Sequence, residues 1–146
     1  MLFLDVNVCL YAFRPTVSER SREVAAWLDA RLGGPERVLV SESVLASMIR
    51  IATHPRIFEE PASPADAVAF VDALLRAPRV AVVRPGPGVW PIFRDYVGDL
   101  RLTGNDVADA YLAATAVDAG AGMVTSDRGF TRFPGLRVIE PVPGGA

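Results

Sequence analysis

The residues of this chain best suited to chemistry are four carboxylates spread over most of its length. Three of them directly follow short apolar segments of the kind that form buried strands, and the fourth lies near the start of a long helical pattern. Carboxylates that are crowded together raise one another's pKa values and favour protonation unless cations are bound. A group of this kind therefore predicts a cation site. The four residues are Asp5, Glu42, Asp109 and Asp127.

The residue types around these acids narrow the chemistry to hard divalent ions. Oxygen ligands without cysteine or histidine favour Mg²⁺ or Mn²⁺ over zinc, and the chain has one cysteine and one histidine. Such an ion lowers the pKa of a bound water and stabilises the charge that develops on a phosphodiester. Two ions would hold both the attacking and the leaving oxygen. None of the basic residues is lysine. This absence excludes P-loop NTPases, Schiff-base enzymes and receiver domains.

Each acid also has an ordinary structural interpretation. The three that follow apolar segments would serve equally as a helix cap, a first-turn acid or a turn residue. Asp106 and Asp109 both lie where a helix dipole favours anions. Asp106 is better explained as a capping companion of Thr103 or Asn105 than as a metal ligand. Taken singly each acid is weak evidence, so the prediction depends on their joint placement.

The elements that would position these acids alternate between strands and helices. Short apolar segments predict strands at 2–5, 37–40, 80–83, 123–124 and 136–139. Helical spacing and capping residues predict helices at 6–13, from Thr16 or Ser18 to Gly33, from Ser41 through Ala52, from Ser63 to about Arg76, at about 89–98 and at about 105–119.

This alternation predicts an α/β domain with a mostly parallel sheet of four or five strands and helices on both faces. Ligand sites in open sheets form outside the carboxyl ends of the strands. The acids that follow strands would therefore meet at one edge, and Asp109 joins them if its helix begins at that edge. We expect one domain over residues 1–140 and a frayed tail at 141–146.

The composition fits a globular domain with no membrane segment. The chain has 146 residues, of which 51% are hydrophobic and 22% charged, and this is enough to bury a core. No apolar run is long enough to span a bilayer, and the start lacks signal-peptide features. We therefore expect a cytoplasmic protein. The net charge of −2 is unlike that of most nucleic-acid binders, but the balance turns slightly basic if four acids hold metal.

Four other noticeable residues fit structural roles better than chemical ones. His54, which precedes a proline at a helix end, is expected to cap that helix rather than to act as a base. Cys9 lies in an apolar helix and is expected to be a small core residue. Trp27 and Trp90 are expected to pack in the core or at an interface rather than to stack on bases.

Several segments resemble known motifs of one family. Residues 4–8 (LDVNV) resemble the opening strand motif of PIN domains, and residues 109–116 (DAYLAATA) resemble their central helix motif. Residues 124–130 (VTSDRGF) resemble the late strand–turn motif of the same family. Residues 50–58 and 133–137 are similar to a subgroup of VapC toxins. The similarity covers nearly the whole chain, with the motifs in the right order.

The resemblance implies a specific activity and specific partners. It implies a metal-dependent endoribonuclease that acts as the toxin of a VapBC-type toxin–antitoxin pair, hydrolyses RNA phosphodiester bonds and inhibits translation. A VapB-type antitoxin would hold it inactive, and the toxin would be a cytoplasmic homodimer. By the same resemblance Asp5, Asp109 and Asp127 would be ligands of Mg²⁺ or Mn²⁺.

The sequence departs from the family pattern at two positions. The usual glutamate of the helix after the second strand falls at Ser47, so Glu42 would have to supply that catalytic carboxylate from one turn earlier. The second acid of the late motif is replaced by Gly129. These departures leave three or four carboxylates for the site.

Contacts with RNA and with the antitoxin are expected at two further places. Phosphate contacts dominate nucleic-acid affinity, and five arginines are candidates for them. Residues 14–32, with their amphipathic pattern, would offer an apolar groove to the antitoxin. The five arginines are Arg14, Arg50, Arg56, Arg128 and Arg132.

Two other functions compete with the nuclease. A catalytically weak PIN-like module that binds RNA or protein is favoured by the serine at position 47. A phosphatase or nucleotide-binding domain ranks lower, because the chain has no Gly-rich phosphate loop and because Asn7 stands two residues after Asp5, where a second aspartate would be needed.

Overall fold

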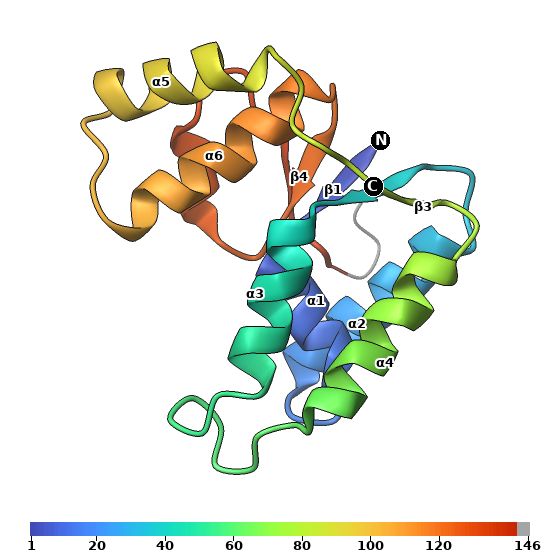
Figure 1. Cartoon of the computed structure of the whole chain (residues 1–146). Coiled ribbons are helices and arrows are strands. Elements are labelled where there is room, and N and C mark those ends of the chain that lie inside the picture. Colours follow the sequence, from blue (N-terminus) through green and yellow to red (C-terminus); the bar gives the residue numbers. More distant parts are fainter. Residues whose placement is uncertain (143–146) are drawn as a thin grey trace.

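A five-stranded, entirely parallel sheet forms the centre of the molecule, whose computed structural model describes residues 1–142 (Figure 1). The order of the strands is β3-β2-β1-β4-β5, and every pairing is parallel. The predicted sheet is therefore confirmed at the upper end of the expected strand number. The strands are β1 (Leu2–Leu4), β2 (Val38–Val40), β3 (Val80–Val82), β4 (Gly122–Val124) and β5 (Val138–Ile139).

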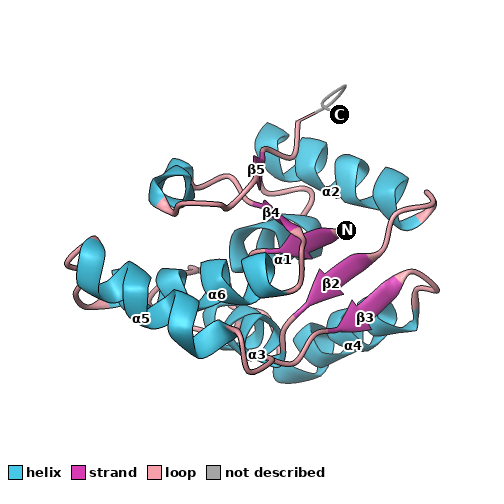
Figure 2. Cartoon of the chain, turned by 90° about the horizontal axis from the view of Figure 1, so that it is seen from above, coloured by secondary structure: helices cyan, strands magenta, loops and turns pink. Residues whose placement is uncertain are grey.

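Helices cover both faces of this sheet, as predicted. Those that connect the first three strands, α1 to α4, gather on one side, and α5 and α6 pack together on the other (Figures 1 and 2). The helices are α1 (Val6–Phe13), α2 (Glu19–Leu32), α3 (Glu42–Ala52), α4 (Pro64–Arg76), α5 (Val89–Asp99) and α6 (Asn105–Asp118), with a short 3₁₀ helix, η1, at Arg128–Arg132.

Local capping explains where several helices begin. Ser18, Ser41 and Ser63 each accept a hydrogen bond through the side-chain oxygen from the backbone N–H three residues further on, which satisfies one of the free donors at a helix start. Ser18, and not Thr16, is the cap of α2.

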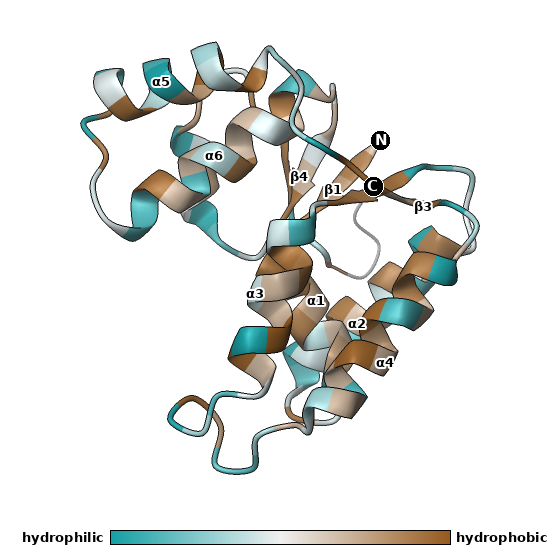
Figure 3. Ribbon diagram, viewed as in Figure 1, coloured by the Kyte–Doolittle hydropathy of each residue, from teal (hydrophilic) through white to brown (hydrophobic). Residues whose placement is uncertain are grey.

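The core lies on both faces of the central strands. All residues of β1, β2 and β4 are buried, and Figure 3 shows β1 and β4 as hydrophobic, in contrast to the mainly hydrophilic loop between α3 and α4. Phe3, Phe130 and Met48 are among the largest fully buried side chains. A central parallel strand buried on both faces needs a continuous apolar run, which is the pattern that identified these strands.

The strand register sets two distant parts of the chain next to each other. Leu4 of β1 pairs with Val124 of β4, and the backbone N–H of Asp5 donates to the carbonyl of Val124 at 3.1 Å. Asp5 and Thr125 therefore leave the sheet side by side at its carboxyl edge. Because α6 leads directly into β4, the N-terminal half of α6 lies at the same edge.

Of the tail predicted at 141–146, residues 143–146 lie outside the described residues. Within residues 1–142, no helix combines the length and the apolar character that crossing a bilayer requires.

Candidate active site

Asp5 is a buried carboxylate with a full set of local donors. Its Oδ1 accepts from the backbone N–H of Val6 at 2.6 Å, and its Oδ2 accepts from Asn7 Nδ2 and from the Thr125 hydroxyl, both at 2.6 Å. Burial raises the pKa of Asp5; the hydrogen bonds from Thr125 and Val6 oppose that rise, and the charge of Asp127 adds to it. Asp5 is thus the cap of α1, as its structural interpretation predicted, and also a member of a larger polar group.

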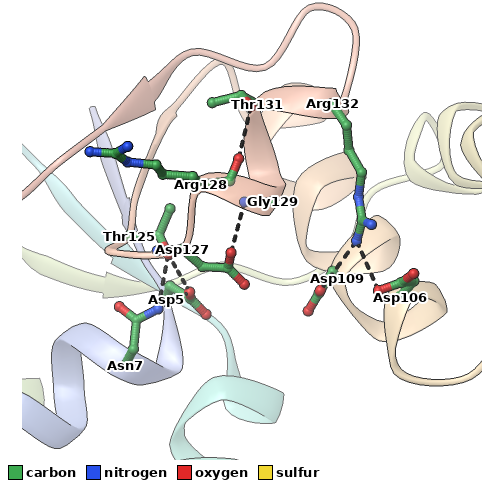
Figure 4. Close-up of polar contacts among 10 residues, drawn as sticks. All are labelled: Asp5, Asn7, Asp106, Asp109, Thr125, Asp127, Arg128, Gly129, Thr131 and Arg132. Carbon is green, nitrogen blue, oxygen red and sulfur yellow. Dashed lines mark hydrogen bonds and ion pairs between the residues drawn. The ribbon is translucent and has the colours of Figure 1, made fainter.

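Thr125 and Asn7 tie the loop after β4 to the start of α1 (Figure 4). The Thr125 hydroxyl oxygen accepts from Asn7 Nδ2 at 2.9 Å and from the backbone N–H of Asp127 at 3.0 Å. Asn7 Oδ1 in turn accepts from the backbone N–H of Ser126 at 3.2 Å. The loop that carries Asp127 is therefore held against the residues that hold Asp5.

Asp127 lies exposed at the start of η1. Its Oδ1 accepts from the backbone N–H of Gly129 at 2.7 Å, so it is a cap here as well. A Cβ atom at position 129 would lie 3.0 Å from that Oδ1. This closeness is a physical reason for glycine where the resemblance predicts a second acid.

Asp109 faces Asp5 and Asp127 from α6 on the other side of the site (Figure 4). Burial, followed by the negative charges of Asp5 and Asp127, raises the pKa of Asp109 to about 6, and Arg132 opposes this rise. A carboxyl group whose pKa is raised by two other acids lies in a field that attracts cations. Asp5, Asp109 and Asp127 thus lie close enough for Asp109 to be influenced by both of the others.

Arg132 is the positively charged side chain that contacts Asp109 in the structure. Its Nη2 lies 3.1 Å from Asp106 Oδ1 and 3.5 Å from Asp109 Oδ2. The prediction that Asp106 is a capping companion was wrong: the N-cap of α6 is Gly104, which has no side chain to cap the helix, and the Asp106 carboxylate pairs with Arg132.

The carboxylate oxygens of Asp5, Asp109 and Asp127 are ligands suited to a hard divalent ion, but the three side chains do not surround a common position. Among residues 1–142, no three His, Cys, Asp or Glu side chains lie close enough to hold a single metal ion. Arg132 engages Asp109, and the Gly129 amide engages Asp127. An ion bound here would therefore compete with Arg132 for Asp109.

Glu42 is not brought to the other three acids. It is exposed in the first turn of α3, and its Oε1 lies 3.9 Å from Arg84 Nη2. The face of α3 that carries Ser43 and Ser47 lines a groove of about 460 Å³, together with Tyr111 of α6.

The five arginines expected to contact RNA are spread over different places. Arg14 donates to the carbonyl of Glu60 at 2.7 Å and lies over the Phe58 ring. Arg50 and Arg56 are exposed at the end of α3 and just after it, whereas Arg128 is exposed beside Asp127. Arg132 is held by the acids already described.

The remaining singled-out residues take local roles. The expectation that His54 caps α3 was wrong: Thr53 is the C-cap, and its hydroxyl donates to the carbonyl of Ile49 at 2.8 Å. His54 Nδ1 instead accepts from the backbone N–H of Arg56 at 3.0 Å, in the turn after the helix. Cys9 is fully buried, and burial followed by the charge of Asp5 raises its pKa to about 12. Trp27 is buried in the core, whereas Trp90 is exposed.

Two contributors were missed by sequence reasoning. Thr125 was considered only as part of a motif, although its hydroxyl joins Asp5 to the loop of Asp127. Arg20, in the first turn of α2, donates to Ser126 Oγ at 3.0 Å and to Glu140 at 3.2 Å. The polar residues immediately after β4 were the available signal for Thr125; nothing local distinguishes Arg20 from other surface arginines.

Comparison with known proteins identifies the family. The model of the PIN domain matches residues 2–136. Ribonuclease VapC43 of Mycobacterium tuberculosis is 43% identical over 144 residues, which cover 99% of this chain and 97% of the relative. The chain belongs to the VapC family of PIN-domain proteins. Another member, Ribonuclease VapC31 of the same organism, is 38% identical over 141 residues, covering 97% of this chain and 99% of that protein.

Solved structures agree on the fold. VapBC2 from Rickettsia felis, bound to a DNA fragment from its promoter, superposes with a TM-score of 0.69 at 18% identity, covering 96% of this chain and 98% of that one. VapC20 of Mycobacterium tuberculosis, described as a toxin that cleaves the sarcin–ricin loop, gives a TM-score of 0.65 at 17% identity, with 94% and 99% covered. At these identities the likeness concerns the fold of this VapC-family chain.

Proposed function

We propose that this VapC-family protein is a divalent-metal-dependent endoribonuclease, the toxin of a toxin–antitoxin pair, which hydrolyses RNA in the cytoplasm and so inhibits translation. The observation that carries the proposal is the placement of Asp109 opposite Asp5 and Asp127 at the carboxyl edge of the sheet (Figure 4), where burial and the charges of these two acids raise the pKa of Asp109. Relatives named as ribonucleases, similar over nearly their whole length, support the same activity.

In this proposal Asp5, Asp109 and Asp127 hold Mg²⁺ or Mn²⁺. The bound ion would supply activation of a water molecule and stabilisation of charge on the phosphodiester. The chain's own contribution is to fix the ligands: Asn7 and Thr125 orient Asp5, and the Gly129 amide orients Asp127. Glu42 is left out of the proposed ligand set, because it is exposed and faces Arg84.

The RNA backbone would be held by arginines at the edge of this site. Arg128 is exposed next to Asp127, and it lines a hollow of about 310 Å³ with Ser126 and Thr131. The cation and the hydroxyl groups suit a phosphate and its sugar, whereas Asp127 and Glu140, which also line the hollow, would repel the phosphate unless a cation is bound. Arg14, Arg50 and Arg56 lie at the far end of α1 and α3, so we propose them as contacts to a more distant part of a folded RNA.

An apolar groove supports a protein partner. It has a volume of about 270 Å³ between α1, the start of α2 and the segment after α3, and Val17 and Ile57 on its rim are exposed. Several structural neighbours are VapBC complexes. We therefore propose that a VapB-type antitoxin docks here, on part of the stretch 14–32, as predicted from its pattern. We also propose a homodimer, for which the exposed Trp90 on α5 is a candidate contact.

The alternative is a catalytically weak module that binds RNA or protein. Two observations favour it: Ser47 occupies the groove beside α6 where the resemblance predicts a glutamate, and within residues 1–142 no three acids close around one point. The two functions differ in whether the purified chain cuts RNA.

The test is cleavage of structured RNA by the purified chain with Mn²⁺, followed on denaturing gels. We expect cleavage that stops with EDTA and falls by at least about a hundredfold in Asp5→Asn and Asp109→Asn, the order of loss seen when an electrostatic contributor to catalysis is removed. Asp72→Asn, which changes an exposed acid on α4, is the matched control. Cleavage that persists in both site variants, or with excess EDTA, would exclude the metal mechanism; intact RNA with every cellular RNA tested would favour the binding module.

A further inference from the structure

Arg132 is fixed by packing in a position from which it reaches two acids. Its guanidinium lies 5.0 Å from the centroid of the buried Phe133 ring, and its Nε is buried with no hydrogen-bond partner within residues 1–142. The side chain is only partly exposed, at 33%. A buried donor without a partner costs stability, and the polar contacts that this guanidinium makes with the described part of the chain are those of Nη2 with two carboxylates.

The two acids at that tip are not held equally. Asp106 accepts from Arg132 Nη2 at 3.1 Å, within the usual range of N–H···O hydrogen bonds, whereas Asp109 lies 3.5 Å from the same Nη2 atom, beyond that range. Asp109 also lies in the negative field of Asp5 and Asp127. The Asp109 carboxylate thus lies between Arg132 on one side and the two acids Asp5 and Asp127, which would attract a cation, on the other (Figure 4).

We propose that Arg132 is the internal counter-ion that stands in for the divalent cation at Asp109, and that Asp106 keeps Arg132 in place when Asp109 turns to the ion. This inference rests on the proposed metal-dependent function. Arg132 and Asp106 are positioning residues in this scheme: neither is a ligand, and both set how readily Asp109 becomes one.

The scheme gives opposite effects for the two residues. In Arg132→Gln the competitor of the ion is gone, so Mn²⁺ binds more tightly. In Asp106→Asn the arginine has only Asp109 to pair with, so Mn²⁺ binds more weakly. Coupled neighbours of this kind give changes of roughly 2- to 150-fold in a binding constant. Arg132→Lys retains the charge, so we expect affinity close to that of the wild type.

The loss of a charge would by itself also make Mn²⁺ bind more tightly in Arg132→Gln and more weakly in Asp106→Asn. A double-mutant cycle distinguishes this simple charge effect from the proposed coupling of the two residues. If Asp106 acts through Arg132, Asp106→Asn has no effect once Arg132 is glutamine. If both act only through their charge, the two effects add. Arg128→Gln removes a nearby exposed charge of the same sign and serves as the matched control; we expect a smaller effect than that of Arg132→Gln.

The experiment is calorimetric titration of MnCl₂ into the full chain after dialysis against EDTA, with thermal unfolding measured on the same samples. We expect the changes in affinity to be non-additive. We also expect Arg132→Gln to melt at a lower temperature than the wild type without ions, and Mn²⁺ to raise the melting temperature of this variant by more than it raises that of the wild type. Additive changes, or equal effects of Arg128→Gln and Arg132→Gln, would overturn the inference while leaving the metal site intact. A folded wild type that binds no Mn²⁺ would overturn the proposed function as well. If Arg132→Gln does not fold, unchanged affinity in Asp106→Asn overturns the inference.

Discussion

Asn7 and Thr125 are separated by 118 positions in the sequence, yet Asn7 Nδ2 donates to Thr125 Oγ1 at 2.9 Å, and both side chains donate to the same oxygen of Asp5. This triangle joins α1 to the loop after β4. It gives the buried carboxylate two donors on Oδ2, and the orientation of that carboxylate is thereby fixed before any ligand binds.

Removal of the Asn7 amide tests this arrangement. Asn7→Ala takes one donor from the buried Asp5 and leaves the Ser126 amide without its acceptor, so we expect a loss of about 1–3 kcal/mol in the free energy of unfolding. Urea denaturation without metal measures it. Asn105→Ala, at the exposed first residue of α6, is the control and should change stability by less than about 0.5 kcal/mol. Equal effects of the two substitutions would contradict the role of the triangle.

The raised pKa of Asp109 predicts how stability depends on pH in the absence of divalent ions. Folding raises this pKa from 3.8 to about 6, so the folded state binds more protons than the unfolded state between these values. The contribution of Asp109 to stability is therefore fully present below pH 3.8 and is lost as pH rises through about 6. The raised pKa of Asp5 acts in the same direction.

Melting temperatures measured from pH 4 to pH 8 in EDTA test this dependence. We expect Asp109→Asn to flatten the profile and to be the more stable protein at pH 7, because the variant carries no charge at this position. Added Mg²⁺ should restore stability to the wild type above pH 6 and not to the variant. A profile unchanged by the substitution would show that Asp109 does not carry the effect.

The groove beside α6 allows a gain of function to be predicted. Ser47 lines it together with Val6 and Ala108, the neighbours of Asp5 and Asp109. Ser47→Glu adds a carboxylate on that side, so we expect Mn²⁺ to bind several-fold more tightly, as affinity follows the number of charged ligands. Ala46→Glu, one residue earlier and exposed, adds the same charge on another face of α3 and should leave the calorimetric affinity unchanged. Equal gains from both would indicate a general charge effect.

Two glycines near α5 give stability changes of opposite sign. A Cβ at Gly88 would contact the Asp118 carboxylate, which lies at the N-terminus of α5. Gly88→Ala should displace that carboxylate and cost about 0.3–1 kcal/mol. A Cβ added at Gly98, within α5, would meet no atom of residues 1–142 within 4 Å, and Gly98→Ala should stabilise the helix by about 0.5–1 kcal/mol. Urea denaturation measures both; in an Asp118→Ala background the cost at Gly88 should disappear.

Much of the fold could be predicted because its signals are local. Capping serines mark helix starts, and continuous apolar runs mark the buried strands of a parallel sheet. The extent of the edge strand β5 was predicted less well: this strand was expected at 136–139 but covers only Val138–Ile139. Edge strands have a partner on one side only, so their ends depend on tertiary contacts that the sequence pattern does not carry.

Only those residues of the site whose positions are determined by the ends of strands could be predicted from the sequence. Asp5 and Asp127 follow neighbouring parallel strands, and this relationship follows from topology alone. Glu42 also follows a strand, but a residue at a helix start points in a direction set by the helical rotation, and here it faces Arg84. The pairing of Arg132 with Asp106, 26 residues apart, depends on how η1 packs on α6, and no local pattern indicates it.

The place of β4 between β1 and β5 has a consequence for synthesis of the chain. A ribosome delivers Asp5 first, but its partner Thr125 only when most of the polypeptide has been made. Contacts that join the two ends of a chain form late and are slow to close. A nascent or prematurely terminated copy that ends before residue 122 lacks β4, one of the two strands that flank β1, and also the loop that completes the triangle. Such a copy contains Asp5 without the donor Thr125 that holds its carboxylate in place.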